Sequence, residues 1–358
     1  MDQYIRGAVL GEGTFGAVYK AVHRKTGQVV ALKKVKSVNA KEGVDVPALR
    51  EIKLLKEIHH PNVINLIDAF PHKKNLILVL ECAASDLEAV IKDRNIVLSP
   101  ADVKSYLQMV LQGLAACHAH WVLHRDVKPN NCLLMSDGQL RLADFGLARV
   151  FGSPVTEASG RPYTTQVFAR WYRAPELFYG APQYGAAVDV WAAGCIFAEL
   201  LLRRPWFPGD SDIDMLSRVF QVLGTPTTTN WADVAALPNY LEFLPTPATP
   251  LKSVFPAASP DALDLLSQMM SLSPAHRPSC AQALAHPFFT NSPLPTPHAK
   301  LPRPISREEA PLQQAKGHAV KIERPEGYES PGPLQPAAKR RHFEVDVKKL
   351  GSLSPQAA

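Results

Sequence analysis

Residues 124–131 read His124-Arg125-Asp126-Val127-Lys128-Pro129-Asn130-Asn131, and Asp144-Phe145-Gly146 begins thirteen residues after Asn131. Transfer of a phosphoryl group needs a carboxylate that orients the attacking hydroxyl, a cation beside the moving phosphate, and oxygen ligands for magnesium. Asp126 suits the first role and Lys128 the second. Asn131 and Asp144 carry hard oxygen donors of the kind that Mg²⁺ prefers. Either motif alone is weak, but together they predict phosphoryl-transfer chemistry.

A glycine-rich stretch lies upstream and reads Leu10-Gly11-Glu12-Gly13-Thr14-Phe15-Gly16-Ala17-Val18. Glycines let backbone amides approach phosphates without a Cβ in the way. In a dinucleotide-binding fold, the same spacing would open a helix. Here strand-forming residues flank a Thr26-Gly27 turn, so we expect a β-hairpin. Val18 and Ala31 would then enclose an adenine ring, and Lys33 would reach the α- and β-phosphates.

Lys33 needs a carboxylate partner, and residues 47–58 supply one. Pro47 suits the first turn of a helix, and apolar residues recur on one face of the predicted helix. Glu51 lies four residues before the apolar Leu55 and can turn inward. A glutamate on a helix usually faces solvent, but Lys33 gives this one a partner. We therefore expect an ion pair between Lys33 and Glu51.

With these motifs, residues 4 to about 290 resemble a eukaryotic protein kinase of the cyclin-dependent kinase family. Further matching motifs are Trp171-Tyr172-Arg173-Ala174-Pro175-Glu176, Asp189-Val190-Trp191, Gly209-Asp210-Ser211-Asp212-Ile213-Asp214 and Leu223-Gly224-Thr225-Pro226. The resemblance implies an α+β, bilobal fold. A small, mainly β N-lobe would cover residues 4–82, and a larger, mainly α C-lobe would cover residues 83–289. The apolar periodicity of residues 103–114 independently predicts a long helix before the catalytic loop.

The resemblance also assigns roles to single residues. ATP, with Mg²⁺ as its cofactor, would bind between the lobes, and Leu80 would occupy the gatekeeper position. Glu176 would pair with Arg277, and Asp189 would brace the backbone of the catalytic loop. The catalytic set would be Asp126, Lys128, Lys33 and Glu51, with Asn131 and Asp144 as metal ligands. The implied nucleotide-binding residues are Leu10, Gly11, Glu12, Gly13, Thr14, Phe15, Gly16, Ala17, Val18, Ala31, Lys33, Glu81, Ala83, Asp86 and Leu133.

Several stretches are similar to the cyclin-dependent-kinase-activating kinases in particular. These stretches are residues 48–55, 86–88, 91–93, 120–126, 128–131, 151–154 and 301–304. This similarity implies a proline-directed serine/threonine kinase with a cyclin H-like partner, an assembly subunit and general transcription factor IIH. Its implied substrates are the activation segments of other cyclin-dependent kinases and the carboxy-terminal repeats of RNA polymerase II. A cell-cycle cyclin-dependent kinase and a catalytically weak kinase scaffold stay open as alternatives.

Three arginines predict a phosphate-binding cluster. Arg50, Arg125 and Arg149 come from three segments that a folded kinase brings together. Converging guanidiniums repel one another, and a phosphate would relieve that repulsion. Thr164, twelve residues before Glu176, matches the activating threonine of the family. Ser153, which precedes a proline, is a second candidate phosphorylation site by resemblance.

Two positions depart from the family pattern. Cell-cycle members carry an inhibitory tyrosine after the glycine-loop threonine, whereas this chain has Phe15, which cannot be phosphorylated. Ala169 stands where the family usually has a threonine whose hydroxyl bonds the catalytic aspartate and lysine. Its loss would cost about 1 kcal/mol of positioning. We therefore expect an active but slower enzyme.

Composition narrows the class of protein. The 358 residues suit a two-lobed catalytic core with an extension, and the five cysteines show no paired spacing, which argues against a zinc site or a disulfide framework. The first residues lack the pattern of a secretion signal. The most apolar stretch, residues 190–202, is too short to span a bilayer and predicts a buried helix instead. We expect no membrane association.

Beyond Phe289 the composition changes. Residues 292–358 hold eleven prolines, and eleven Lys or Arg against seven Asp or Glu. With few large apolar residues to bury, residues 290–358 are predicted to form a disordered, basic tail. Lys339-Arg340-Arg341-His342 fits either a nuclear import signal or a solvated basic patch, so we expect a nuclear and also cytoplasmic protein. No aromatic residues alternate with these charges, which argues against direct nucleic-acid binding.

Overall fold

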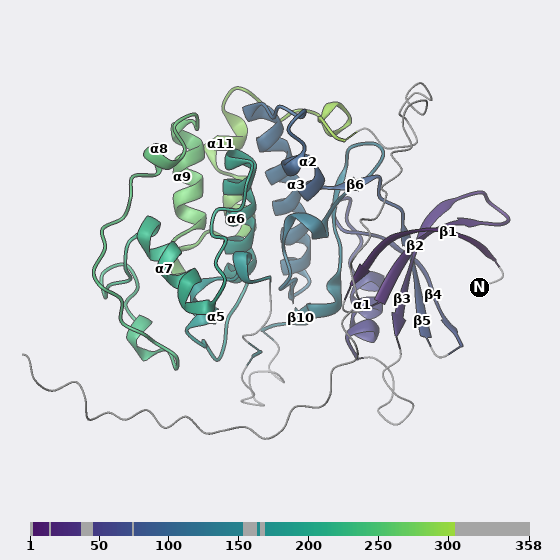
Figure 1. Cartoon of the computed structure of the whole chain (residues 1–358), viewed down its shortest axis with the longest axis horizontal. Helices are drawn as coiled ribbons and strands as arrows, with labels where there is room; N and C mark the ends of the chain where they lie inside the picture. The colour runs from purple at the N-terminus through teal and green to yellow at the C-terminus, as the bar shows by residue number, and fades with distance from the viewer. Residues whose placement is uncertain are drawn as a thin grey trace, which may run out of the picture. The chain divides into compact units, whose positions relative to one another are not determined.

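The computed structural model describes residues 3–13, 16–36, 46–73, 75–152, 163–164 and 169–304. Thr14, Phe15, Ser153 and the basic cluster at 339–342 lie outside these ranges. The part of the chain up to residue 304 has a β-rich N-lobe followed by a helical C-lobe (Figure 1). This confirms the predicted α+β, bilobal fold. Among the described residues, no helix combines the length and the apolar character that a membrane crossing needs.

One antiparallel sheet, with strand order β1-β2-β3-β5-β4, forms most of the N-lobe. Its strands are β1 (Tyr4–Gly13), β2 (Gly16–His23), β3 (Val29–Lys36), β4 (Leu66–His72) and β5 (Asn75–Glu81). Strands β2 and β3 form the predicted hairpin, and Gly27 in its turn has φ of 72°, a conformation that glycine adopts without steric cost. Helix α1 (Val46–Glu57) confirms the helix predicted at 47–58. Ala48, Leu54 and Leu55 are buried on its apolar face, in one hydrophobic cluster with side chains of β3 and β5.

Gly16 meets a steric requirement of the sheet itself. It pairs with Gly13 at the end of the β1–β2 hairpin, and its φ is 142°. A Cβ at this position would lie 1.9 Å from the carbonyl oxygen of Lys34 on β3, whereas one at Gly11 would meet nothing within 4 Å. Gly16 is therefore needed for the packing of β2 against β3, independently of any nucleotide bound beside the loop.

Two long helices form the centre of the C-lobe. The helices of this lobe are α2 (Leu87–Lys92), α3 (Pro100–Ala119), α5 (Pro175–Phe178), α6 (Ala187–Leu202), α7 (Asp212–Leu223), α8 (Leu251–Val254), α9 (Pro260–Met269), α10 (Cys280–Leu284) and α11 (Pro287–Thr290). Ser99 and Asp102 form a capping box that begins α3. Helix α6 confirms the buried helix predicted at 190–202, because every residue from 188 to 200 is buried. One of its two buried carboxylates, Glu199, accepts a hydrogen bond from the Tyr172 hydroxyl at 2.7 Å.

Short strands hold the loops that carry the chemical motifs. Strands β6 (Ser85–Asp86), β8 (Cys132–Leu134) and β9 (Leu140–Leu142) form one small sheet. Strand β7 (Val122–Leu123) pairs with β10 (Arg149–Val150). The loop at 124–131 therefore connects β7 to β8, and each of these strands is held by a different partner strand. Asp144 follows β9. Loops anchored in this way hold their side chains in place.

The expected start of the disordered tail at residue 290 is wrong, because residues 291–304 pack against the C-lobe. Leu301 is only 4% exposed and belongs to the main hydrophobic core. The hydroxyl of Tyr106 on α3 donates to the carbonyl of Pro302 at 2.5 Å, and Thr296 donates to Asp102 at 2.7 Å. Prolines lack an N–H but keep a carbonyl, so a proline-rich segment can still bond along a surface. Residues 305–358, which hold the rest of the predicted tail, lie outside the described residues.

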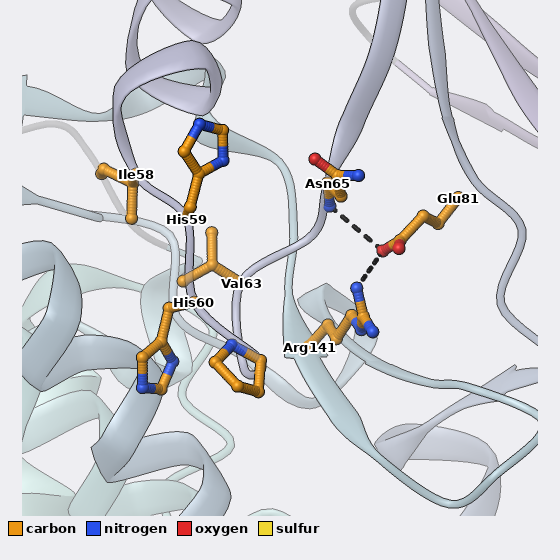
Figure 2. Close-up of a pocket in the computed structure, with 8 residues that line it drawn as sticks. Ile58, His59, His60, Val63, Asn65, Glu81 and Arg141 are labelled. Carbon is orange, nitrogen blue, oxygen red and sulfur yellow. Dashed lines mark hydrogen bonds and ion pairs between the residues drawn. The ribbon is translucent and has the colours of Figure 1, made fainter.

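A polar contact joins the two lobes behind the segment that connects them. Figure 2 shows Arg141, on β9, pointing at Glu81, the last residue of β5. The Glu81 carboxylate accepts from the Arg141 guanidinium and from the backbone N–H of Asn65, at 3.2 Å from the latter. Together with residues 58–61 and Val63, these side chains line a hollow of about 330 Å³. Both partners of the ion pair are about one-fifth exposed, so solvent screens the pair only in part.

Arg141→Met is expected to lower the free energy of unfolding by about 1 kcal/mol, because it leaves the largely buried Glu81 carboxylate with fewer donors. Urea denaturation of the full chain measures this change. Arg94→Met is the matched control, since Arg94 is exposed and has no ion pair within the described residues. Equal losses in the two variants would contradict a role for Arg141 in joining the lobes.

Candidate active site

Lys33 on β3 lies between two carboxylates that come from different elements. Its Nζ is 2.8 and 2.9 Å from the carboxylate oxygens of Glu51 on α1, and 2.8 Å from Oδ1 of Asp144. Burial acts to lower the pKa of Lys33, but the two carboxylates outweigh it and raise that pKa above its ordinary value. Burial acts to raise the pKa of Asp144, but Lys33 holds it below its usual range. The predicted Lys33–Glu51 pair is therefore confirmed, and both Lys33 and Asp144 are charged at neutral pH.

The carboxylate of Asp126 is held on both oxygens. Oδ2 accepts from Nζ of Lys128 and from Nδ2 of Asn131, each at 2.8 Å. Oδ1 accepts from the backbone N–H of Ala169 at 3.3 Å. The position where the family places a threonine hydroxyl thus contributes a weaker backbone donor. These contacts fix the plane of a nearly buried carboxylate.

Asp189, near the start of α6, holds the backbone of the catalytic loop as predicted. Its two oxygens accept from the backbone N–H groups of His124 and Arg125, each at 2.9 Å, and Oδ2 lies 3.0 Å from Nε2 of His118. Burial acts to raise the pKa of Asp189, but these bonds keep it below its ordinary value. The predicted pair of Glu176 with Arg277 is also confirmed, with N–O distances of 2.6 and 2.8 Å.

Asn131 and Asp144 carry the oxygens that suit a magnesium ion. The N–H of Ala143 donates to the carbonyl of Asn131 at 2.9 Å, which brings the two segments together. Asn131 uses its amide nitrogen on Asp126, so its amide oxygen stays available as a ligand. No group of three or more His, Cys, Asp or Glu residues within the described ranges forms a metal site. Two protein oxygens suit Mg²⁺, which usually completes its shell with water and phosphate oxygens.

A cavity of about 390 Å³ opens between the lobes beside these residues. Its lining includes, of the predicted nucleotide-binding residues, Leu10, Gly11, Val18, Ala31, Lys33, Glu81, Ala83, Asp86 and Leu133. It also includes the predicted gatekeeper, Leu80, and the charged or polar Glu51, Asn131 and Asp144. Gly16 and Ala17 are not part of the lining. The side chain of Glu12, the surroundings of Gly13, and all of Thr14 and Phe15 lie outside the described residues.

Sequence reasoning missed several residues that line the cavity. These are Ile64, Ala84, Ser85, Asn130 and Ala143. Asn130 and Ala143 are the sequence neighbours of the predicted metal ligands Asn131 and Asp144, and this adjacency could have identified them. Ile64 had no such signal, because it reaches the cavity through a backbone bond to Leu142 at 2.9 Å, far along the chain.

The three predicted arginines do converge. Burial lowers the pKa of Arg50, and the nearby charges of Arg125 and Arg149 lower it further. Arg50 and Arg125 donate to the carbonyls of Gly146 and Leu147, at 3.5 and 2.7 Å. In the described part of the chain, none of the three arginines has a carboxylate within ion-pair distance. Such a cluster is suited to bind an anion.

Comparisons with known proteins agree with this geometry. The model of the protein kinase domain matches residues 4–289. Cyclin-dependent kinase D-1 of Arabidopsis thaliana is 56% identical over 351 residues, which cover 98% of this chain and 84% of the relative. Cyclin-dependent kinase 7 of Xenopus laevis is 51% identical over 329 residues, which cover 91% of this chain and 92% of the relative.

A solved structure is similar as well. A chain in the structure of the CAK complex from Chaetomium thermophilum bound to ATP-gamma-S superposes with a TM-score of 0.77. The two chains are 40% identical, and the match covers 84% of this chain and 95% of the other. The relatives, the matched domain and the arrangement of Lys33, Asp126 and Asp144 point to the same enzyme class. The chain is therefore a serine/threonine protein kinase that belongs to the cyclin-dependent kinase family.

Proposed function

We propose that this kinase is activated by a cyclin H-like cyclin and phosphorylates two classes of substrate. These are the activation segments of other cyclin-dependent kinases and the carboxy-terminal repeats of RNA polymerase II. An assembly subunit and general transcription factor IIH are further proposed partners. The observation that carries the catalytic part is the contact of Lys33 with both Glu51 and Asp144, because it aligns the lobes around the cavity. The similarity to kinases of the activating type supports the choice of substrates.

ATP is the proposed phosphoryl donor, with its adenine between Val18 and Ala31 and its phosphates near Lys33. Asn131 and Asp144 would hold Mg²⁺. When bound, this ion would neutralise negative charge on the phosphates of ATP. The depressed pKa of Asp144 keeps that carboxylate ionised for this role. Leu80 and Leu133 line the apolar part of the cavity.

Asp126 is the proposed base that orients the substrate hydroxyl and accepts its proton. The Lys128 ammonium, 2.8 Å from the Asp126 carboxylate, is placed to stabilise negative charge on the transferred group. The Asn131 amide holds the same carboxylate from a second direction. Since both contacts come from the residue's own loop, substrate binding need not rearrange them.

The substrate-facing region supports a proline-directed kinase. Arg173, which the family uses to organise the pocket for the following proline, lies 3.5 Å from the carboxylate of Asp212. Trp171 donates its indole N–H to the carbonyl of Gly209 at 3.1 Å. Two of the three motifs that by resemblance mark the proline-directed branch, residues 171–176 and 209–214, therefore contact each other. We also propose that α1 faces the cyclin. Leu49 on this helix is 48% exposed, which is compatible with an apolar partner surface.

Two alternative functions are a cell-cycle cyclin-dependent kinase and a kinase-like scaffold without catalysis. A cell-cycle cyclin-dependent kinase would share the contacts around Lys33 and Asp126, and would differ in its substrates, in its cyclin and in carrying a tyrosine in place of Phe15. A scaffold without catalysis would require Ala169 to disable the site, yet Asp126, Lys128 and Asn131 still form their contacts. The geometry thus favours an active enzyme over a scaffold.

Asp126→Asn is expected to lower phosphate transfer about 100-fold or more, because the amide cannot accept the hydroxyl proton. The full chain is assayed with ATP and Mg²⁺, with and without cyclin H, on a polymerase repeat peptide and on an inactive cyclin-dependent kinase. Asp233→Asn is the matched control at an exposed position. Transfer to neither substrate with cyclin present would contradict the proposal, and transfer to a cell-cycle substrate alone would favour the first alternative.

Ala169→Thr is expected to raise the turnover rate about fivefold, which corresponds to about 1 kcal/mol of improved positioning of Asp126 and Lys128. Ala169→Val, which has the same shape without the hydroxyl, separates hydrogen bonding from packing. Single-turnover phosphate transfer measures the effect. An unchanged rate for the threonine variant would show that the Ala169 backbone N–H already suffices.

We further propose that Lys339-Arg340-Arg341-His342 directs nuclear import and that Thr164 and Ser153 are phosphorylated. Deleting residues 339–342 is expected to reduce nuclear entry of the chain in permeabilised cells, because nuclear import receptors bind clusters of positive charge. The assay omits the cyclin, so that entry bound to a partner cannot hide the effect. Deletion of the uncharged residues 311–314 is the control, and equal entry of both deletion variants would rule out the import signal.

A further inference from the structure

The hydroxyl of Tyr184 joins the activation segment to the catalytic loop. It donates a hydrogen bond to the carbonyl of Thr164 at 2.6 Å and accepts one from Nη1 of Arg125 at 2.9 Å. Tyr184 lies between α5 and α6, far in sequence from both partners. A tyrosine hydroxyl has one proton to donate and lone pairs that accept, so this single group fills both roles.

Neighbouring contacts hold the same short stretch of the activation segment. The N–H of Tyr163 donates to the carbonyl of Pro182 at 2.8 Å. The rings of Tyr163 and Tyr184 meet edge to face, with centroids 5.2 Å apart. The guanidinium of Arg149 lies 3.7 Å above the Tyr163 ring, within the range of a cation–π contact. Residues 163 and 164 are therefore anchored from the 182–184 segment before any phosphate is attached.

Arg125 connects the Tyr184 contact to the proposed catalytic residues. It precedes Asp126 directly, and its Nε donates to the carbonyl of Leu147, just beyond the Asp144-Phe145-Gly146 motif. Its φ of 64° is uncommon for a residue with a Cβ, and such a conformation persists only where surrounding contacts fix it. A loss of the Tyr184 contact would therefore loosen Arg125 beside the proposed base.

We propose that Tyr184 is a positioning residue that replaces the activating phosphate while Thr164 is unphosphorylated. The proposal rests on the proposed role of Thr164 as the activating site. A phosphate on Thr164 would bind the arginine cluster and supply a second link between the same two segments. When Thr164 is phosphorylated, the Tyr184 hydroxyl and the phosphate both connect the activation segment to the catalytic loop, and either one suffices. The unphosphorylated kinase depends on Tyr184, and the phosphorylated kinase does not.

The test compares Tyr184→Phe with the wild type in two forms of the full chain bound to cyclin H. One form carries unmodified threonine at position 164, and the other carries phosphothreonine encoded during translation. We expect Tyr184→Phe to lower kcat about tenfold in the unphosphorylated form and less than threefold in the phosphorylated form, with KM for ATP unchanged. Equal losses in the two forms would overturn the proposal, because a purely structural role does not depend on phosphorylation.

Tyr179→Phe is the matched control, because it also removes one hydroxyl bond to a carbonyl, that of Leu241 at 3.1 Å. Its effect is expected to be the same in both forms. A measurement on the wild type guards against misfolding of the variant. The amide of Tyr163 should be protected from hydrogen exchange in the unphosphorylated chain, and exchange at the unprotected rate would overturn the proposal. If the proposed function itself is wrong, the wild type transfers no phosphate in either form, which distinguishes that outcome from a failure of the Tyr184 proposal.

Discussion

The contact of the Lys33 ammonium with Glu51 and Asp144 is the interaction on which the rest of the site depends. Its three participants come from the N-lobe sheet, from α1 and from the C-lobe. A buried ammonium without carboxylate partners is costly, so removal of either partner would destabilise this arrangement. The contact therefore restricts how α1 and the two lobes can sit around the cavity. A cyclin that binds α1 would act on this same restriction.

The C-lobe supplies rigid support beneath the catalytic loop. Asp189 is fully buried on the apolar helix α6, and it accepts hydrogen bonds from two backbone N–H groups and from His118. These bonds compensate for the removal of its charge from water. The loop that carries Asp126 is therefore tied to the centre of the hydrophobic core. Function sits on a loop, and the core determines where that loop lies.

The activation segment combines neutral and charged contacts in a different way. Arg50, Arg125 and Arg149 lie close together, and among the described residues none has a carboxylate within ion-pair distance. Their repulsion is relieved there by carbonyls, a ring and a hydroxyl. Dipoles and ring faces stabilise a cation less than a phosphate does. The cluster is thus stable enough to form and still able to bind an anion strongly. The Tyr184 hydroxyl is the neutral part of this arrangement that reaches both segments.

By itself the sequence determined the chemistry and the local elements. The spacing around Asp126 and Asp144, the hairpin that carries Lys33 and the helix that carries Glu51 could all be predicted, because they follow from residue types and short-range periodicity. Only the tertiary structure decided that the Ala169 backbone reaches Asp126, that Arg141 meets Glu81, that Tyr184 links Thr164 to Arg125, and that Leu301 is buried. These contacts join residues far apart in the chain, or depend on which surface a segment covers. Local patterns carry no information on them, because packing of the whole core determines which distant groups come within bonding distance.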